Sequence, residues 1–310
     1  MENQSHVTEF ILLGLSQNPN IQKMAFVILL VFYLVTVGGN LFIVVMIICT
    51  PSLFVSPMYF FLAFLSFLDA CFSSVIAPKV IIDSLYERKT ISFQDCMGQI
   101  FAQHFLAGVE VIVLTCMAFD RYVAICKPLH YMTIMNRQLC FLLVGVAWSG
   151  GFLHSMIQIF FMLPLPFCGP NVIDHFMCDL YPLLQLACID TQVLGLMVVA
   201  NSGFICIINF SLLLVSYGVI LNSLRTHSTA ARRKALSTCG SHITVVVLYF
   251  VPCIFVYTRP PTTFSFDKIV AIFYSFVTPF LNPLIYTFRN TEMKNVMKKL
   301  WDKTVIDTEK

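Results

Sequence analysis

The sequence predicts an all-α membrane protein, a bundle of seven transmembrane helices with its N-terminus outside the cell. Three observations lead to this fold class: an apolar composition, seven long apolar stretches, and basic residues concentrated on one side of them. Of the 310 residues, 58% are hydrophobic and only 11% are charged, whereas soluble domains carry about 25% charged residues. This composition argues against a soluble enzyme, a nucleic-acid-binding protein and a disordered chain.

The apolar stretches set the number of crossings. A helix needs about 20 predominantly apolar residues to cross the hydrocarbon core of a bilayer. Stretches of this kind predict spans at residues 24–49, 57–82, 97–120, 139–163, 193–221, 238–258 and 269–288. They are continuous and much longer than the alternating segments of about ten residues that form β-barrels. The chain thus divides into an outer segment (1–23), the bundle (24–289) and an inner tail (290–310).

The two ends of the chain are short. The first 23 residues lack a basic region before an apolar core, so we expect no cleaved signal peptide and take the first span as an uncleaved signal. Residues 290–302 have the pattern of a short amphipathic helix, a helix 8 lying on the cytoplasmic membrane surface.

Basic residues in the loops predict the orientation, because cytoplasmic loops carry an excess of Lys and Arg. Thirteen of the 19 basic residues lie on the side of the C-terminus, five lie on the other side, and Lys79 lies within a span. The C-terminal side is therefore predicted to be cytoplasmic. Asn3-Gln4-Ser5 is an N-glycosylation sequon in the outer segment and agrees with this orientation.

Four of the 12 cysteines lie in the predicted outer segments, and an even number of outer cysteines suggests two disulfides. The sequence alone allows three pairings of the four. They are Cys96, Cys168, Cys178 and Cys188.

Two acidic residues lie deep within spans: Asp69 in the second and Glu110 in the third. Charges in the hydrocarbon cost a few kcal/mol or more and usually face the bundle interior, where they have a function. Two alternatives remain open. Asp69, Glu110 and Asn282 could share a monovalent cation such as Na⁺, or the two acids could form a protonated, neutral pair joined by hydrogen bonds.

Two motifs at the inner end of the bundle indicate a switch. Asp120-Arg121-Tyr122 ends the third span, and the seventh span contains Asn282, Pro283 and Tyr286 in an Asn-Pro-x-x-Tyr pattern. Pro283 removes a backbone donor and is expected to kink its helix. We expect Asn282 to satisfy a carbonyl that this kink frees.

These two motifs also point to a known protein family. The chain resembles a vertebrate odorant receptor, a rhodopsin-like (class A) G protein-coupled receptor. The matching blocks run in order along nearly the whole chain, and they are Gly39-Asn40, residues 56–62, 65–69, 117–126, 234–242 and 279–286, and Arg289-Asn290. The sequence departs from the family at Phe54-Val55-Ser56 and at Tyr249-Phe250-Val251-Pro252, where the tyrosine hydroxyl lies one residue away from its usual place.

The resemblance implies disulfides that join Cys96 to Cys178 and Cys168 to Cys188. Residues 175–178 and Asp179 match a pattern proposed in the family as a metal site. Cys178 is required for the disulfide, which leaves only His175 and Asp179 as ligands, so no metal site is predicted here.

A stripe on the outer half of the third span predicts a ligand site. Gln103, His104, Ala107, Gly108 and Val111 share one helix face, and the resemblance implies that this face lines the ligand cavity. It adds matching positions in spans 5, 6 and 7, namely Asn201, Ser202, Ile205, Phe250, Cys253, Ile254, Tyr257, Ile272 and Ser275. No carboxylate or lysine faces this region, so a neutral volatile molecule fits better than a cationic amine. Close helix contact or hydrogen bonds between helices are the alternative roles of these residues.

The resemblance also implies a mechanism. Odorant binding shifts the bundle toward its active state, Arg121 leaves its inner contacts, and Tyr217 and Tyr286 stabilise the opened inner face. A heterotrimeric G protein with a stimulatory or olfactory α subunit then binds there and raises cAMP. The implied location is the plasma membrane of olfactory cilia; membrane lipid is a partner, nucleic acid is not, and no cofactor is expected beyond the Na⁺ alternative.

Three rival functions are not favoured by the sequence. A secondary transporter would show internal repeats, and none is visible between spans 1–3 and 5–7. A retinal protein would need a lysine in the seventh span, and none lies between Lys268 and Lys294. The polar residues of the spans form no nucleophile–base pair, so we predict no enzyme.

Overall fold

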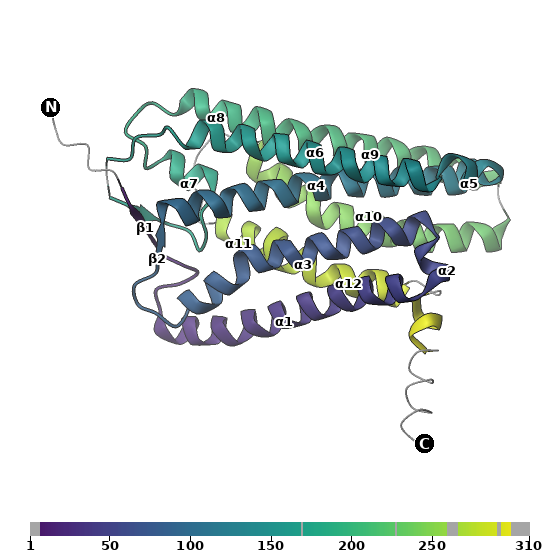
Figure 1. Cartoon of the computed structure of the whole chain (residues 1–310), viewed down its shortest axis with the longest axis horizontal. Coiled ribbons are helices and arrows are strands. Elements are labelled where there is room, and N and C mark those ends of the chain that lie inside the picture. The colour runs from purple at the N-terminus through teal and green to yellow at the C-terminus, as the bar shows by residue number, and fades with distance from the viewer. Residues whose placement is uncertain (1–6, 169, 227, 259–265, 290–292, 299–310) are drawn as a thin grey trace, which may run out of the picture.

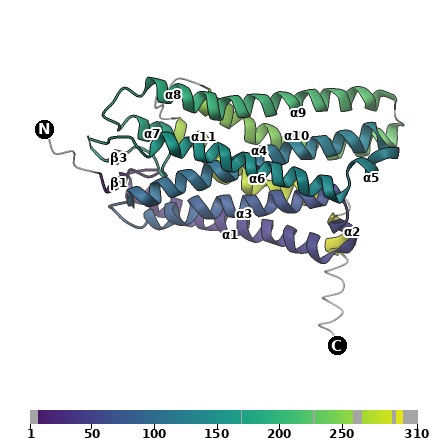
Figure 2. The same ribbon diagram turned by 45° about the horizontal axis from the view of Figure 1, so that its top comes forward.

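The computed structural model describes residues 7–168, 170–226, 228–258, 266–289 and 293–298. In that part of the chain, seven helical segments are long and apolar enough to cross a membrane. They lie side by side in one bundle, and β1 lies at the opposite end of it from α2 and the end of α12 (Figures 1 and 2). This architecture confirms the predicted all-α bundle of seven membrane-spanning helices.

The seven segments follow the predicted spans in order. Their bounds are α1 (Pro19–Cys49), α3 (Pro57–Asp83), α4 (Phe93–Cys126), α6 (Arg137–Met162), α8 with α9 (Gln192–Val198 and Phe204–Ser223), α10 (Thr229–Tyr257), and α11 with α12 (Asp267–Ile272 and Thr278–Arg289). Short helices α2 (Pro51–Phe54), α5 (Tyr131–Ile134) and α7 (Leu180–Leu184) lie in the connections, with 3₁₀ turns at Pro128–His130 and Leu224–Thr226.

Several helices begin before the predicted spans because polar caps precede the apolar stretches. The Asn18 side chain accepts a hydrogen bond from the Asn20 amide at the start of α1, and Pro19 occupies the first turn. Ser92 Oγ accepts from the Asp95 amide at 3.0 Å at the start of α4, and Asn136 Oδ1 accepts from the Leu139 amide at 2.9 Å at the start of α6. Such caps satisfy the free N–H groups of a first turn, and hydropathy alone does not detect them.

The fifth and seventh spans are not continuous α-helices. Each contains a single π-helical segment, Val199–Gly203 between α8 and α9 and Phe273–Val277 between α11 and α12. Short π segments often occur at functional sites because they leave local backbone groups unpaired and shift the side chains that follow. The Phe273 carbonyl accepts hydrogen bonds from both the backbone amide and, at 3.2 Å, the Oγ1 hydroxyl of Thr278.

The seventh span corrects one expectation. Pro283 has no N–H to donate to the Pro279 carbonyl one turn earlier, and Asn40 Nδ2 of α1 donates to that carbonyl at 3.0 Å. Asn282 does not satisfy it; its amide donates to Asp69 instead. Gly39, beside Asn40, packs against the Pro283 ring, and a Cβ there would make an ordinary contact at 3.4 Å with Pro283 Cγ.

The end of the bundle that the charge pattern predicts to be outer carries a small sheet, which the sequence does not predict. β1 (Glu9–Leu12) lies between β2 (Thr90–Ser92), which is antiparallel to it, and β3 (Val172–Ile173), which is parallel to it. Phe10 on β1 is fully buried, with ring centroids of Phe93 and Phe167 at 6.2 and 5.4 Å. The strands are too short for a clear alternation in the sequence.

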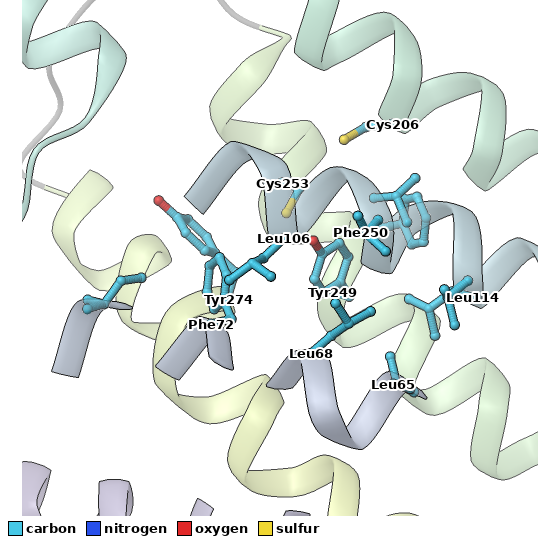
Figure 3. Close-up of a cluster of buried hydrophobic side chains, with 14 of the residues drawn as sticks. Leu65, Leu68, Phe72, Leu106, Leu114, Cys206, Tyr249, Phe250, Cys253 and Tyr274 are labelled. Atoms are coloured by element: carbon cyan, nitrogen blue, oxygen red, sulfur yellow. The ribbon is translucent and has the colours of Figure 1, made fainter. Parts of the chain in front are cut away.

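The core lies around α3 and α4. In both of these helices 67% of the most apolar window is buried, against 22% in α1 and in the α8–α9 span. Apolar side chains from α3, α4, α9 and α10 converge with Tyr274 near the centre of the bundle (Figure 3). The poorly buried faces of α1 and α9 are apolar and suit contact with lipid.

Candidate ligand-binding site

A cavity of about 40 Å³ lies in the outer half of the bundle, between α3, α4, α6, α9 and α10. This volume holds a few water molecules. Its walls are formed by Phe72, Gln103, His104, Ala107, Gly108, Val111, His154, Ser202, Ile205, Cys206, Tyr249, Cys253, Tyr257 and Tyr274. Figure 3 shows Cys206, Tyr249, Cys253 and Tyr274 of this set around one region of the interior.

All five residues of the predicted α4 stripe line the cavity, together with Ser202, Ile205, Cys253 and Tyr257. Five other predicted residues are not among its lining residues. They are Asn201, Phe250, Ile254, Ile272 and Ser275. Asn201 Nδ2 instead donates to the His154 carbonyl at 3.2 Å, and Phe250 stacks on Phe210 with centroids 5.7 Å apart.

Five lining residues were not predicted: Phe72, His154, Cys206, Tyr249 and Tyr274. A signal existed for two of them, because Cys206 lies one helical turn from Ser202 and Tyr249 one turn from Cys253. The Tyr249 hydroxyl donates to the Ala107 carbonyl at 3.3 Å. The position of His154 depends on how closely α6 approaches α4, which the sequence does not show.

Two glycines set that approach. A Cβ on Gly151 of α6 would lie 2.6 Å from Val109 Cγ2 and 2.7 Å from the Phe105 carbonyl oxygen. A Cβ on Gly108 of α4 would lie 3.0 Å from Gly151 Cα. Because no larger side chain fits without movement, α4 and α6 touch through backbone here, and His154 reaches the cavity.

The polar groups of the cavity are neutral or only partly paired. The His104 and His154 ring centroids are 5.5 Å apart, and His104 also contacts Tyr257 at 5.9 Å. His154 Nδ1 is buried and has no hydrogen-bond partner within the described residues. No Asp, Glu, Lys or Arg is among the lining residues. The site can therefore exchange hydrogen bonds with a ligand but offers it no counter-ion.

Asp69 and Asn282 meet below this cavity. Asn282 Nδ2 donates to Asp69 Oδ2 at 2.8 Å, and the Glu110 carboxyl interacts directly with that of Asp69. Asp69 Oδ1 and Glu110 Oε1 are buried without a hydrogen-bond partner in the described part of the chain. Both alternatives for this cluster, a bound cation and a shared proton, fit these unpaired oxygens.

Several residues of the predicted inner switch are hydrogen-bonded or ion-paired. Asp120 is fully buried, pairs with Arg121 and accepts a hydrogen bond from the Tyr131 hydroxyl at 2.7 Å. Tyr217 of α9 hydrogen-bonds His242 of α10. Tyr122 is half-buried. The hydroxyl of Tyr286 is buried, and no described residue hydrogen-bonds it.

The outer loop is fixed to α4. The structure joins Cys96 to Cys178 and Cys168 to Cys188, the pairing that the resemblance implies. The Cys178 amide donates to Gln99 Oε1 at 2.9 Å. Because the disulfide takes the Cys178 sulfur, the pattern at residues 175–179 retains only His175 and Asp179 as potential metal ligands.

His175 and Asp179 have internal roles in this loop. His175 Nδ1 accepts a hydrogen bond from the Met177 amide at 3.3 Å, and Asp179 Oδ1 accepts one from Leu180 at 2.7 Å at the start of α7. Burial lowers the pKa of His175 to about 4, with nearby Lys268 adding to the effect. Burial raises the pKa of Asp179 to about 6.

Two predictions concern residues outside the described part of the chain. Asn3 of the glycosylation sequon lies among residues 1–6, and the predicted helix 8 at 290–302 is described only for residues 293–298, which are helical. Glycosylation and the full extent of helix 8 stay predictions.

Comparison with known proteins identifies the family. A profile of olfactory receptors matches residues 29–303. The chain is 58% identical to human olfactory receptor 4S2 over 305 residues, which cover 98% of each chain. It is 61% identical to human olfactory receptor 4A5 over 303 residues (98% of this chain, 96% of the relative). It is 56% identical to mouse olfactory receptor 4B13 over 301 residues (97% and 98%). The chain therefore belongs to the olfactory receptor family and is a G protein-coupled receptor of the membrane, not an enzyme.

Proposed function

We propose that this receptor binds a small, neutral, volatile organic molecule at the outer cavity, which must widen from about 40 Å³ to admit it. Binding then activates a stimulatory or olfactory-type G protein, which raises cAMP. The observation that carries the proposal is a buried cavity with unpaired polar capacity and no charged lining residue. A cationic ligand would lack a counter-ion there, whereas one hydroxyl, carbonyl or ether group could bond to a histidine or tyrosine.

In the proposed mechanism, α10 connects the ligand cavity to the inner end of the bundle. This helix carries Tyr249, Cys253 and Tyr257 at the cavity and His242 at the inner contact with Tyr217. A ligand that binds one arrangement of α10 more tightly shifts the population toward that arrangement. Movement of α10 would then break the Tyr217–His242 contact and release Arg121 from Asp120 for the G protein.

The proposed orientation places the sheet outside and the Asp120–Arg121 pair in the cytoplasm. It follows from the excess of basic residues on the C-terminal side. The proposed location is the plasma membrane of olfactory cilia. Asp69, Glu110 and Asn282 form a central polar cluster below the cavity, where either Na⁺ or a proton stabilises the inactive arrangement.

A cAMP reporter screen against a broad panel of volatiles tests the function. For an agonist found this way, His104→Phe and Tyr257→Phe should raise the half-maximal concentration about tenfold, the loss of one hydrogen bond of about 1.4 kcal/mol. Asn201→Ala should have a smaller effect, because its amide contacts the His154 carbonyl and not the cavity. Ser74→Ala is the control, since Ser74 contacts Tyr33 away from the cavity. Unchanged responses in both His104→Phe and Tyr257→Phe would contradict the assignment.

A further inference from the structure

One hydroxyl of the outer cavity has its direction set by a residue that lies outside the cavity. Ser202 lines the cavity, is buried, and belongs to the π-helical segment Val199–Gly203. The side-chain amide of Gln158, on α6, donates a hydrogen bond to Ser202 Oγ at 2.7 Å. Gln158 is also buried and is not among the cavity-lining residues. Because the serine oxygen is the acceptor in this contact, the serine proton points elsewhere.

The proton of Ser202 has no acceptor among the residues that the structure describes. Serine and threonine in helices commonly donate to the carbonyl one turn earlier, and Ser74 and Thr244 both do so at 2.7 Å. Ser202 makes no such bond within the described residues, and its π-helical turn is wider than an α-helical one. A buried donor without an acceptor is costly. The Ser202 O–H group is therefore available to a molecule in the cavity.

The other polar groups of the cavity do not fix the polarity of a ligand in the same way. The Tyr249 hydroxyl already donates to the Ala107 carbonyl at 3.3 Å. The neutral rings of His104 and His154 can each donate one hydrogen bond and accept another. Ser202 is thus the cavity group whose side-chain partner defines it as a donor.

A donor of this kind favours some odorants over others. A carbonyl oxygen accepts the hydrogen bond and brings no donor of its own into the cavity. An alcohol accepts it as well, but its own O–H group then needs an acceptor in an apolar surrounding. A hydrocarbon accepts no hydrogen bond, and a thiol accepts only a weak one.

We propose that Gln158 determines the ligand class of this receptor by holding Ser202 as a hydrogen-bond donor, so that the preferred ligands are volatile aldehydes, ketones and esters. The carbonyl oxygen of the ligand accepts the hydrogen bond from Ser202 Oγ. Gln158 is a positioning residue, because it acts through Ser202 and does not line the cavity. This inference rests on the proposed function, which places the ligand at the outer cavity.

Odorants that share one carbon skeleton test the proposal. The half-maximal concentration of a ketone in the cAMP assay is compared with that of the matching alcohol and hydrocarbon. We expect the ketone to act at a concentration at least about tenfold lower than the hydrocarbon and about threefold lower than the alcohol. Ser202→Ala should remove most of the preference for the ketone. Ser155→Ala is the matched control and should keep it, because the Ser155 hydroxyl donates to the Phe101 carbonyl at 2.7 Å and does not line the cavity.

Variants of Gln158 separate positioning from a general structural role. Gln158→Leu removes the amide donor and leaves the Ser202 hydroxyl free to turn, so the preference for the ketone over the hydrocarbon should fall about three- to fivefold. A purely structural defect would raise both half-maximal concentrations by the same factor and leave their ratio unchanged. In a receptor that already carries Ser202→Ala, Gln158→Leu should change the ratio no further, because Gln158 acts through Ser202.

Three results would overturn the proposal. They are a wild-type receptor that responds to the alcohol or the hydrocarbon at lower concentrations than to the ketone, a Ser202→Ala variant that keeps the preference, and a Gln158→Leu substitution that changes the ratio in the Ser202→Ala receptor. Failure of the proposed ligand site gives a different result, since His104→Phe and Tyr257→Phe would then leave every response unchanged. If only the role of Gln158 and Ser202 is wrong, those two variants still weaken the agonists.

Discussion

The outer cavity and the inner switch treat their polar groups differently. In the cavity, His154 Nδ1 has no partner among the described residues, and Gln103 reaches only the Met177 sulfur at 3.5 Å. At the inner end, Asp120 is bound by both Arg121 and Tyr131, and Tyr217 is bound by His242. Unpaired groups are costly when buried, so a ligand that pairs with them gains affinity. The paired groups at the inner end keep their partners until the helices that carry them move apart.

Under the proposed function, this difference assigns ligand specificity to the outer cavity and signalling to the inner network. The unpaired groups of the cavity would then pair with different ligands, whereas every ligand would act through the one connected network of Asp120, Arg121 and Tyr131. Changes at the inner end should therefore abolish every response, whereas changes at the outer end should shift responses ligand by ligand.

The largest expected effect is at the switch. Arg121→Ala should abolish odorant-driven cAMP for every agonist, since the group released on activation is gone. The measurement is the maximal cAMP response divided by surface receptor, from antibody staining of intact cells. Arg225→Ala removes a basic residue elsewhere on the same side and should signal normally. Full signalling from Arg121→Ala would show that the inner network is not the switch.

The next effect is on the outer loop. Cys96→Ser should prevent delivery to the cell surface, because residues 175–179 lose their link to α4 and a native disulfide typically contributes about 2–5 kcal/mol. Surface staining against total receptor measures this. Cys49→Ser is the control, because Cys49 is an exposed free cysteine. Normal surface delivery of Cys96→Ser would mean that the outer end does not need the disulfide.

The sequence predicted most of the fold and the α4 part of the site. Long apolar stretches identify the membrane spans directly. The residues that share one face of a helix follow from their spacing in the sequence, so the cavity-lining residues from Gln103 to Val111 could be predicted. Residues that reach the cavity from another helix, such as His154, depend on a close approach at Gly151 that only three-dimensional contacts show. Ile254 and Ile272 are predicted as ligand contacts from the resemblance alone, and neither residue lines the cavity. The strands could not be predicted because segments of four residues or fewer are too short to show the alternation of apolar and polar residues that marks a strand.

A smaller effect tests that approach. Gly151→Ala should lower the free energy of unfolding by about 1–3 kcal/mol, because the new Cβ forces α6 away from α4. Gly151→Ala should also raise the half-maximal concentration of agonists, because His154 lies on α6 and moves with that helix. Gly145→Ala lies in the same helix, where a Cβ meets nothing within 4 Å, and should be neutral or slightly stabilising. Thermal unfolding of the purified variants measures both; equal stability would contradict the role of the glycine contact.

The smallest expected effect is the pH dependence of stability that comes from the outer loop. Two buried groups there, His175 and Asp179, change the stability in opposite directions as pH falls. His175 has a lowered pKa of about 4, so its contribution to stability is present above its ordinary value of 6.5 and is lost as pH falls. Asp179 has a raised pKa of about 6, so its contribution is present below 3.8 and is lost as pH rises through 6. Between pH 7 and 5, His175 should lose about 2 kcal/mol and Asp179 should regain about 1 kcal/mol.

Variants separate the two groups. Asp179→Asn should make the receptor more acid-sensitive than the wild type, because only the loss at His175 remains. His175→Gln should make it less acid-sensitive for the opposite reason. Unfolding midpoints at pH 7 and pH 5 give the comparison, and identical pH dependence in all three proteins would show that neither group titrates in this range.

The position of β1 at the centre of the outer sheet has a consequence for biosynthesis. Residues 9–12 are made early, yet one of their partners, β3, is translated about 160 residues later. At roughly 5–20 residues per second, the edge of β1 that pairs with β3 stays unpaired for on the order of ten to thirty seconds. The sheet can therefore be completed only after the first four membrane-spanning helices have been translated.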